Sequence, residues 1–289
     1  MLRGDVMRPS IDFARAVLGF LWKRLKYTVV GWRAWWFVFV PGEFLNILLG
    51  LATWYFFTFY LASTGRVGDI ISYIILGMGV NTVLRSALVH LYWAIHGLYS
   101  GYLESGGFRM RYWEYYSLAG VPKYVAVVGF MVFDNLRSFV SLALYLVVGV
   151  FVFRVISGSL QSYALALSLL LTGYLATFTL GVLVASSFWF FVRYRELTLN
   201  PFVWVIDALV PVVSGMYYPL DVLPPYLRAV GELLPHTHTI EAIRVALGVS
   251  RGDIVPHAAV LLVYISLLPV AVLVFRKCEH WALRKSGIL

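Results

Sequence analysis

Three residues near the carboxyl-terminal end have the types and spacing of a small catalytic or metal-binding group. His236, His238 and Glu241 fall within six consecutive positions, directly after Pro235. Imidazole and carboxylate groups this close together can ligate a divalent metal ion or transfer protons. Polar side chains at a helix start just after a proline more commonly bond to the backbone. Backbone bonding is therefore the simpler expectation, and a metal or catalytic role is the alternative.

Three further charged residues lie inside long apolar stretches, where charge is costly unless it is paired or reaches water. They are Arg85, Asp134 and Arg137. Arg85 is about 13 residues from its end of the apolar region and Asp134 about 10, so at ~1.5 Å per helical residue they lie at similar heights. We expect an ion pair between Arg85 and Asp134. The alternative is that these charges line a path for a substrate.

The composition identifies the chain as an integral membrane protein. Hydrophobic residues make up 61% of the 289 positions and charged residues 13%, whereas a soluble domain is about half apolar and a quarter charged. Repeated stretches of about 20 apolar residues predict spanning helices rather than a barrel, whose strands would alternate. We predict an all-α fold with six transmembrane helices, at about 37–61, 70–98, 124–153, 163–192, 201–218 and 258–275.

The segments outside these spans are expected to complete a single domain, 1–289. Residues 1–36 are basic, and apolar residues recur in them at spacings of three and four from Ile11 to Trp32. This pattern predicts an amphipathic helix lying in the membrane interface. Residues 37–276 are expected to form the six-helix membrane domain, and 277–289 a cytoplasmic tail.

The distribution of charge predicts the orientation of the chain. Its net charge is +9, and sixteen lysines and arginines fall on the side that holds both termini, against five on the other side. Cytoplasmic loops are enriched in these residues, so we expect a multi-pass plasma-membrane protein with both termini in the cytoplasm. The positive charge then reflects topology, and no nucleic-acid partner is expected. The single cysteine, Cys278, excludes an internal disulfide and a cysteine-based metal cluster.

Residues 211–247 are interrupted by prolines in a way that no spanning helix tolerates. Pro219 stops the preceding apolar segment, Pro224 precedes a short amphipathic stretch, and Pro235 ends that stretch and opens another before Glu241. Proline fits a first helical position and terminates a helix elsewhere. The pattern predicts two short helices that form a re-entrant segment on the outer face, before the last transmembrane helix.

This segment resembles the outer region of the permease subunits of type-2 ABC exporters. The stretch SGMYYPLDVLPPYLRAVGELLPHTHTIEAIR, 214–244, is similar to that family's succession of S-G-x-x-x-P, L-P, L-P-x-T/H and E-A-x-R. The matching residues that we single out are Ser214, Gly215, Pro219, Pro224, Pro235, His238, Glu241 and Arg244.

A second resemblance lies between the predicted second and third spans. The stretch RYWEYYSLAGVPKY, 111–124, is similar to the family's coupling helix, a G-T-x-E run followed by proline and a basic residue. Arg111 and the following tyrosine stand where the family usually has Gly-Thr. Glu114, Pro122 and Lys123 occupy the positions that match the family's pattern. Charged and aromatic side chains cluster around Glu114, as at the centre of a small interface, so the residues predicted to couple to the ATPase are Arg111, Trp113, Glu114, Pro122 and Lys123.

The resemblance implies a half-transporter rather than an enzyme. Two permease subunits, as a homodimer or a heterodimer, would form the translocation path, and each would dock on a separate cytosolic ABC ATPase. The chain contains no G-x-x-x-x-G-K-[ST] phosphate loop, so ATP and magnesium are expected on that partner and no cofactor on this chain. The expected substrate is amphipathic, drug-like or lipid-linked. The alternatives are export of a lipid-linked polysaccharide by the same fold, and a membrane-embedded enzyme using the His236, His238 and Glu241 group.

Overall fold

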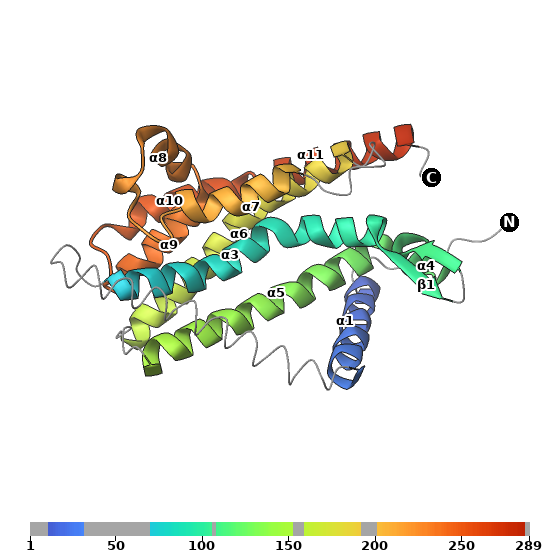
Figure 1. Cartoon of the computed structure of the whole chain (residues 1–289), viewed down its shortest axis with the longest axis horizontal. Coiled ribbons are helices and arrows are strands. Elements are labelled where there is room, and N and C mark those ends of the chain that lie inside the picture. The colour runs from blue at the N-terminus through green and yellow to red at the C-terminus, as the bar shows by residue number, and fades with distance from the viewer. Residues whose placement is uncertain (1–10, 32–69, 106–107, 153–158, 192–200, 287–289) are drawn as a thin grey trace.

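Figure 1 shows the computed structural model, which describes residues 11–31, 70–105, 108–152, 159–191 and 201–286. The predicted first transmembrane helix, 37–61, lies outside the described residues. The described helices are α1 (Ile11–Gly31), α3 (Ile70–Ser100), α4 (Tyr112–Leu118), α5 (Lys123–Val147), the π-helical η1 (Val148–Val152), α6 (Leu160–Phe191), α7 (Pro201–Val213), the 3₁₀ turn η2 (Leu220–Val222), α8 (Pro225–Glu232), α9 (Pro235–Ala246), α10 (Ile254–Ser266) and α11 (Leu268–Ser286).

Four of the described helical segments are long and apolar enough to cross a membrane. They are Ser72–Ser100, Tyr124–Phe151, Leu160–Phe190 and Ile254–Ala282, and the last of them joins α10 to α11. The multi-pass helical character predicted from composition is therefore confirmed, whereas the count of six spans stays a prediction. The predicted fifth span, 201–218, is shorter in the structure, because α7 ends at Val213 and the chain then turns.

The residues that the structure describes are helical apart from turns and one small hairpin, which the all-α prediction lacked. Strand β1 (Tyr102–Ser105) pairs antiparallel with β2 (Phe108–Arg111), with Tyr102 opposite Arg111. The hairpin leads directly into α4. It places this short helix beyond the end of α3, where the amide of Tyr112 donates to the carbonyl of Gly101 at 3.1 Å.

Helix α3 is the centre of the described bundle, with α5 and α6 packed along it (Figure 1). The contact with α6 is close because Gly181 faces the α3 backbone: a Cβ at this position would lie 2.2 Å from the carbonyl oxygen of Ala87. Small residues allow such approaches between membrane helices, which pack by van der Waals contact rather than by a hydrophobic driving force.

The two larger clusters of buried hydrophobic side chains follow one another along the length of the bundle. One joins α3, α6 and α7 around Tyr92, Phe188 and Trp189, at the end of the bundle that also holds α4. The other joins α3, α6 and α9 around Leu84, Leu170 and Ile240. Helices α8 and α9 thus lie at one end of the bundle and helix α4 at the other (Figure 1).

Helix α1 crosses one end of α5 steeply (Figure 1). Its Phe20 ring packs edge-on against Phe130 and Tyr116, at centroid distances of 5.5 and 5.8 Å. By contrast, Leu18 and Trp22 are 64% and 67% exposed, which leaves an apolar surface on this helix. The predicted helix is present, and its position in a membrane interface stays a prediction.

Candidate functional site

The proline-rich segment 211–247 folds as a turn followed by short helices that begin at the prolines. The chain reverses after α7 at Gly215, whose φ of +71° lies in the left-handed region that glycine adopts without strain. Pro219 precedes η2, Pro224 precedes α8, and Pro235 is the first residue of α9. The two predicted short helices are therefore present as α8 and α9. Ser214 is fully buried at the start of the turn.

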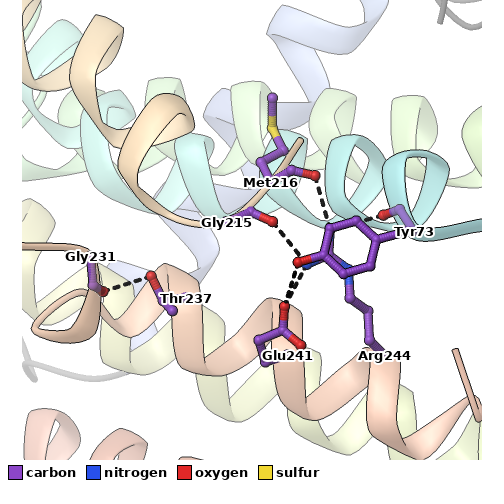
Figure 2. Close-up of polar contacts among 7 residues, drawn as sticks. All are labelled: Tyr73, Gly215, Met216, Gly231, Thr237, Glu241 and Arg244. Atoms are coloured by element: carbon purple, nitrogen blue, oxygen red, sulfur yellow. Dashed lines mark hydrogen bonds and ion pairs between the residues drawn. The ribbon is translucent and has the colours of Figure 1, made fainter. Parts of the chain in front are cut away.

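Arg244 fastens this turn to α3 (Figure 2). Its Nη1 donates to the carbonyl of Gly215 at 2.8 Å and to Oε1 of Glu241 at 2.7 Å. Its Nη2 donates to the carbonyls of Tyr73 and Met216, at 2.8 and 2.9 Å. The Tyr73 ring lies 3.2 Å from the guanidinium carbon, and its hydroxyl donates to Oε1 of Glu241 at 2.9 Å. We call this network the Arg244 clasp.

The hydrogen bonds of the Arg244 clasp compensate for burying a positive charge. The Arg244 side chain is fully buried, and burial lowers its pKa, whereas Tyr73 and Glu241 oppose that shift. Arginine keeps its proton in proteins, so the buried cation needs acceptors, and the clasp provides them at Nη1 and Nη2 but not at Nε. Two of its terminal N–H groups reach carbonyls of the turn, one reaches α3 and one the Glu241 carboxylate.

The close approach of the turn to α3 depends on Gly77. A Cβ at this position would lie 2.2 Å from the carbonyl oxygen of Met216 and 2.6 Å from Nη2 of Arg244. A second contact tightens the same segment, because Thr237 Oγ1 donates to the carbonyl of Gly231 at 2.7 Å (Figure 2). The turn, α8 and α9 therefore form one packed unit against α3.

A polar cavity of about 530 Å³ lies between α3 and α5, beneath this unit. Met216 and Tyr217 of the turn border it, so the clasp fixes part of its wall. The α3 lining runs from Met78 to Trp93, which is about 22 Å at the helical rise per residue. The polar and charged side chains that line the cavity are Asn81, Thr82, Arg85, Ser86, His90, Asp134, Arg137, Ser138 and Ser141.

The charges inside the apolar stretches pair differently from the sequence prediction. Both Nε and Nη2 of Arg85 lie 2.5 Å from the carboxylate oxygens of Asp207, in a bidentate ion pair that joins α3 to α7. The predicted pair of Arg85 with Asp134 is therefore wrong. Depth along a span fixes height but not the direction of a side chain around the helix or the identity of the facing helix. Asp134 and Arg137 do line the same cavity as Arg85.

Replacing Arg85 with leucine should destabilise the protein, because it leaves the Asp207 carboxylate, only 13% exposed, without its partner. The double variant Arg85→Leu, Asp207→Leu should recover a coupling energy of about 1–3 kcal/mol, measured as a difference in unfolding free energy in detergent. The matched control is Arg85→Leu with Asp134→Leu, which should recover less. Additive effects for Arg85 and Asp207 would show that the pair does not stabilise the fold.

An aromatic pocket of about 350 Å³ adjoins this cavity towards α4. Trp93 and Asp134 line both spaces, and Tyr112, Tyr116 and Phe130 complete the aromatic wall of the pocket. Together, the cavity and the pocket extend from the turn at Met216 and Tyr217 to the end of the bundle that holds α4.

The structure does not bring His236, His238 and Glu241 together as one catalytic group. His236 is fully buried, and burial lowers its pKa to about 3, so the ring is neutral at physiological pH. Glu241 belongs to the Arg244 clasp. His238 bonds instead to the backbone of Glu232 and to the ring of His257. Among the described residues, no group of three or more metal-ligating side chains is placed to hold a metal ion.

The residues assigned to coupling make structural contacts within the chain, in and around helix α4. Oε2 of Glu114 accepts the backbone N–H of Arg111 at 2.9 Å, which caps the helix start. Trp113 stacks on Tyr99 at a centroid distance of 6.4 Å and packs against the buried cluster around Trp189. Pro122 precedes α5, and Lys123 is the first residue of that helix. Trp113 is therefore an anchor that holds α4 on the bundle.

Other side chains of α4 point away from the bundle. Leu118 is 77% exposed and Tyr115 is 48% exposed, which gives the helix an apolar outer face. Leu118 was not part of the sequence prediction, and neither it nor Tyr115 is among the residues assigned to coupling. The spacing of 115 and 118 by three residues was a usable signal, since it puts both side chains on one face.

Three residues that make contacts in this site, Tyr73, Asp207 and His257, are not among the site residues predicted from the sequence. Tyr73 and Asp207 lie in or near predicted spans, and their roles depend on which helices are neighbours. His257 opens the last span and meets His238 only because α9 packs against α10. Each of these contacts joins residues separated by at least 19 positions.

No protein-family model matches the chain. The chain is 33% identical over 99 residues to Nodulation protein J of Rhizobium leguminosarum bv. trifolii, which is 33% of this chain and 34% of that protein. It is 37% identical over 101 residues to Nodulation protein J of Neorhizobium galegae, which is 34% of this chain and 35% of that protein. The chain spans about a third of the length of these curated relatives, and over that third it is similar to Nodulation protein J.

Proposed function

We propose that this chain is the permease subunit of a type-2 ABC exporter, not itself an enzyme. It would form half of an outward path for an amphipathic, drug-like or lipid-linked substrate, in the plasma membrane with both termini in the cytoplasm. A separate cytosolic ABC ATPase would bind ATP and magnesium. The similarity to Nodulation protein J supports this assignment at the family level, together with the outer-segment and coupling-helix motifs.

The observation that supports transport most strongly is the polar cavity inside an apolar bundle. Its α3 wall is about 22 Å long, a large part of the ~30 Å hydrocarbon thickness of a bilayer. Charged groups at membrane depth typically face a substrate or ion pathway. The adjoining aromatic pocket would be the cytoplasmic entrance, and the turn held by the Arg244 clasp would close the outer end.

The uneven burial of the spans supports lipid contact and a second permease subunit. Within its most apolar window, Ser72–Ser100 is 72% buried, whereas Ile254–Ala282 is only 11% buried. A span of that hydropathy needs lipid or another apolar helix around it. We infer that α10 and α11 lie at the outside of the subunit, against lipid or the second copy.

The position of α4 supports docking of an ATPase at that end of the bundle. Its exposed apolar side chains, Tyr115 and Leu118, suit the apolar centre of a small interface, and the adjacent chain is rich in charge. Trp113 connects α4 rigidly to α3 through Tyr99, so a movement of the docked ATPase would reach the cavity wall.

Co-expression with a soluble ABC ATPase of the same organism tests the proposed function. The ATPase should co-purify with the tagged permease, and its ATP hydrolysis in lipid vesicles should respond to the permease. An ATPase with its phosphate-loop lysine replaced is the control, since it should assemble without hydrolysing ATP. Failure of every soluble ABC ATPase of the organism to assemble with a folded permease would contradict the proposal.

A further inference from the structure

Two histidines on neighbouring outer helices meet nitrogen to nitrogen. Nδ1 of His238, on α9, lies 3.0 Å from Nδ1 of His257, in the first turns of α10. Both side chains are half-buried, so the pair is held by the fold and still reachable from solvent. The pair is separate from the Arg244 clasp and plays no part in the proposed transport path.

The hydrogen bonds of His238 define which of its nitrogens is free to bind a cation. Nε2 lies 2.9 Å from the carbonyl oxygen of Glu232. A carbonyl only accepts, so Nε2 holds the hydrogen and Nδ1 of the neutral ring presents its lone pair to His257. Metal-ligating histidines have this arrangement, in which the second ring N–H donates to a backbone carbonyl and orients the ring.

We propose that His238 and His257 bind a divalent transition-metal ion, of the zinc type, between their Nδ1 atoms. Without the ion, a proton on Nδ1 of His257 joins the two rings. On metal binding that proton would be released to water while Nε2 of His257 takes up a proton, so the ring stays neutral and its Nδ1 lone pair is free to ligate. Zinc–nitrogen bonds of about 2.0–2.1 Å in tetrahedral geometry would need the two nitrogens about 3.3 Å apart. The two nitrogens would therefore have to separate by a few tenths of an ångström, and the rings would have to turn so that both lone pairs point at the ion.

Two imidazoles alone do not complete a coordination shell. The carboxylates of Glu241 and Asp253 act electrostatically on His257, and both are negatively charged neighbours. No third protein ligand is in place in the part of the chain that the structure describes, so water or an external group would fill the other positions. Imidazole ligands select zinc, copper or nickel over magnesium and calcium.

The ion would fasten the last transmembrane segment to the outer helices. His238 is tied to α8 through the Glu232 carbonyl, and Tyr264 of α10 donates to the carbonyl of Leu233 at the same end of α8. A metal bridge from His238 to His257 would add a third link among α8, α9 and α10. Bound ion should therefore raise the stability of the folded permease.

The test is zinc binding to the full chain, purified in detergent with a tag that contains no histidine. Isothermal titration should give one Zn²⁺ per chain, and a hundredfold excess over the Kd should raise the unfolding midpoint by about 5 °C. His238→Ala and His257→Ala should each weaken binding by at least about tenfold. His280→Ala is the matched control, since that exposed histidine lies in α11, away from the pair.

X-ray absorption of the zinc-loaded wild type provides evidence that does not depend on a folded variant. It should show two imidazole ligands completed by oxygen. Zinc affinity unchanged in either pair variant, equal loss in His280→Ala, or a spectrum with fewer than two imidazoles would each overturn the proposal. The plain hydrogen-bonded pair would then be the role of these residues.

Discussion

Replacing Arg244 with alanine should destabilise the protein by about 3–5 kcal/mol, a large part of the ~5–15 kcal/mol that stabilises a typical fold. The change removes the cation that faces Glu241 and leaves the carbonyls of Tyr73, Gly215 and Met216 without their donor. Thermal unfolding in detergent, followed by size-exclusion recovery, measures the loss. Lysine at 244 should recover only part of it, because a single ammonium cannot reproduce the planar fork of donors.

A pair of glycine variants on α3 tests the same clasp without removing a charge. Gly77→Ala should be destabilising because the new Cβ would overlap the carbonyl of Met216, whereas Gly97 has no heavy atom within 4 Å of its Cβ position. Gly97→Ala is the matched control and should be neutral or slightly stabilising, since alanine is the better helix former. Equal stability of the two variants would show that the turn does not need to sit against α3.

Under the proposed function, replacing Leu118 with arginine should abolish the stimulation of ATP hydrolysis by this chain, with at least a tenfold loss expected for a group at an interface centre. Leu118 is 77% exposed in the isolated chain, so the substitution should leave the permease folded. The measurement is ATPase activity of the co-purified complex in lipid vesicles, compared with the amount of folded permease. Tyr115→Ala, on the same face, should reduce stimulation less severely.

Two controls separate coupling from folding in this experiment. Val222→Arg changes a residue of similar exposure, 72%, in η2 at the opposite end of the bundle, and should leave ATP hydrolysis unchanged. Trp113→Ala should reduce the amount of folded protein, because its ring packs on Tyr99 rather than facing a partner. If Leu118→Arg assembles with its ATPase and stimulates it normally, α4 is not the coupling element.

The sequence by itself determined the class of the molecule and the positions of its breaks. Apolar runs of membrane length predict helices because the bilayer interior leaves no other way to satisfy backbone groups, and four such helices are described. Prolines at 224, 225 and 235 determined where α8 and α9 begin, since the missing N–H and fixed φ act locally. Glu241 and Arg244 also stood out, as part of a motif.

Only the tertiary structure decided which of these residues meet. The direction in which Arg85 points around α3, and therefore its pairing with Asp207 rather than Asp134, follows from how α7 packs, which height along a span does not encode. The same holds for Trp113, which the hairpin and α4 turn inward, and for His238, which meets His257 instead of its neighbours in sequence. Periodicity places a residue on a face of its own helix, whereas the partner across the contact is set by the packing of the whole bundle.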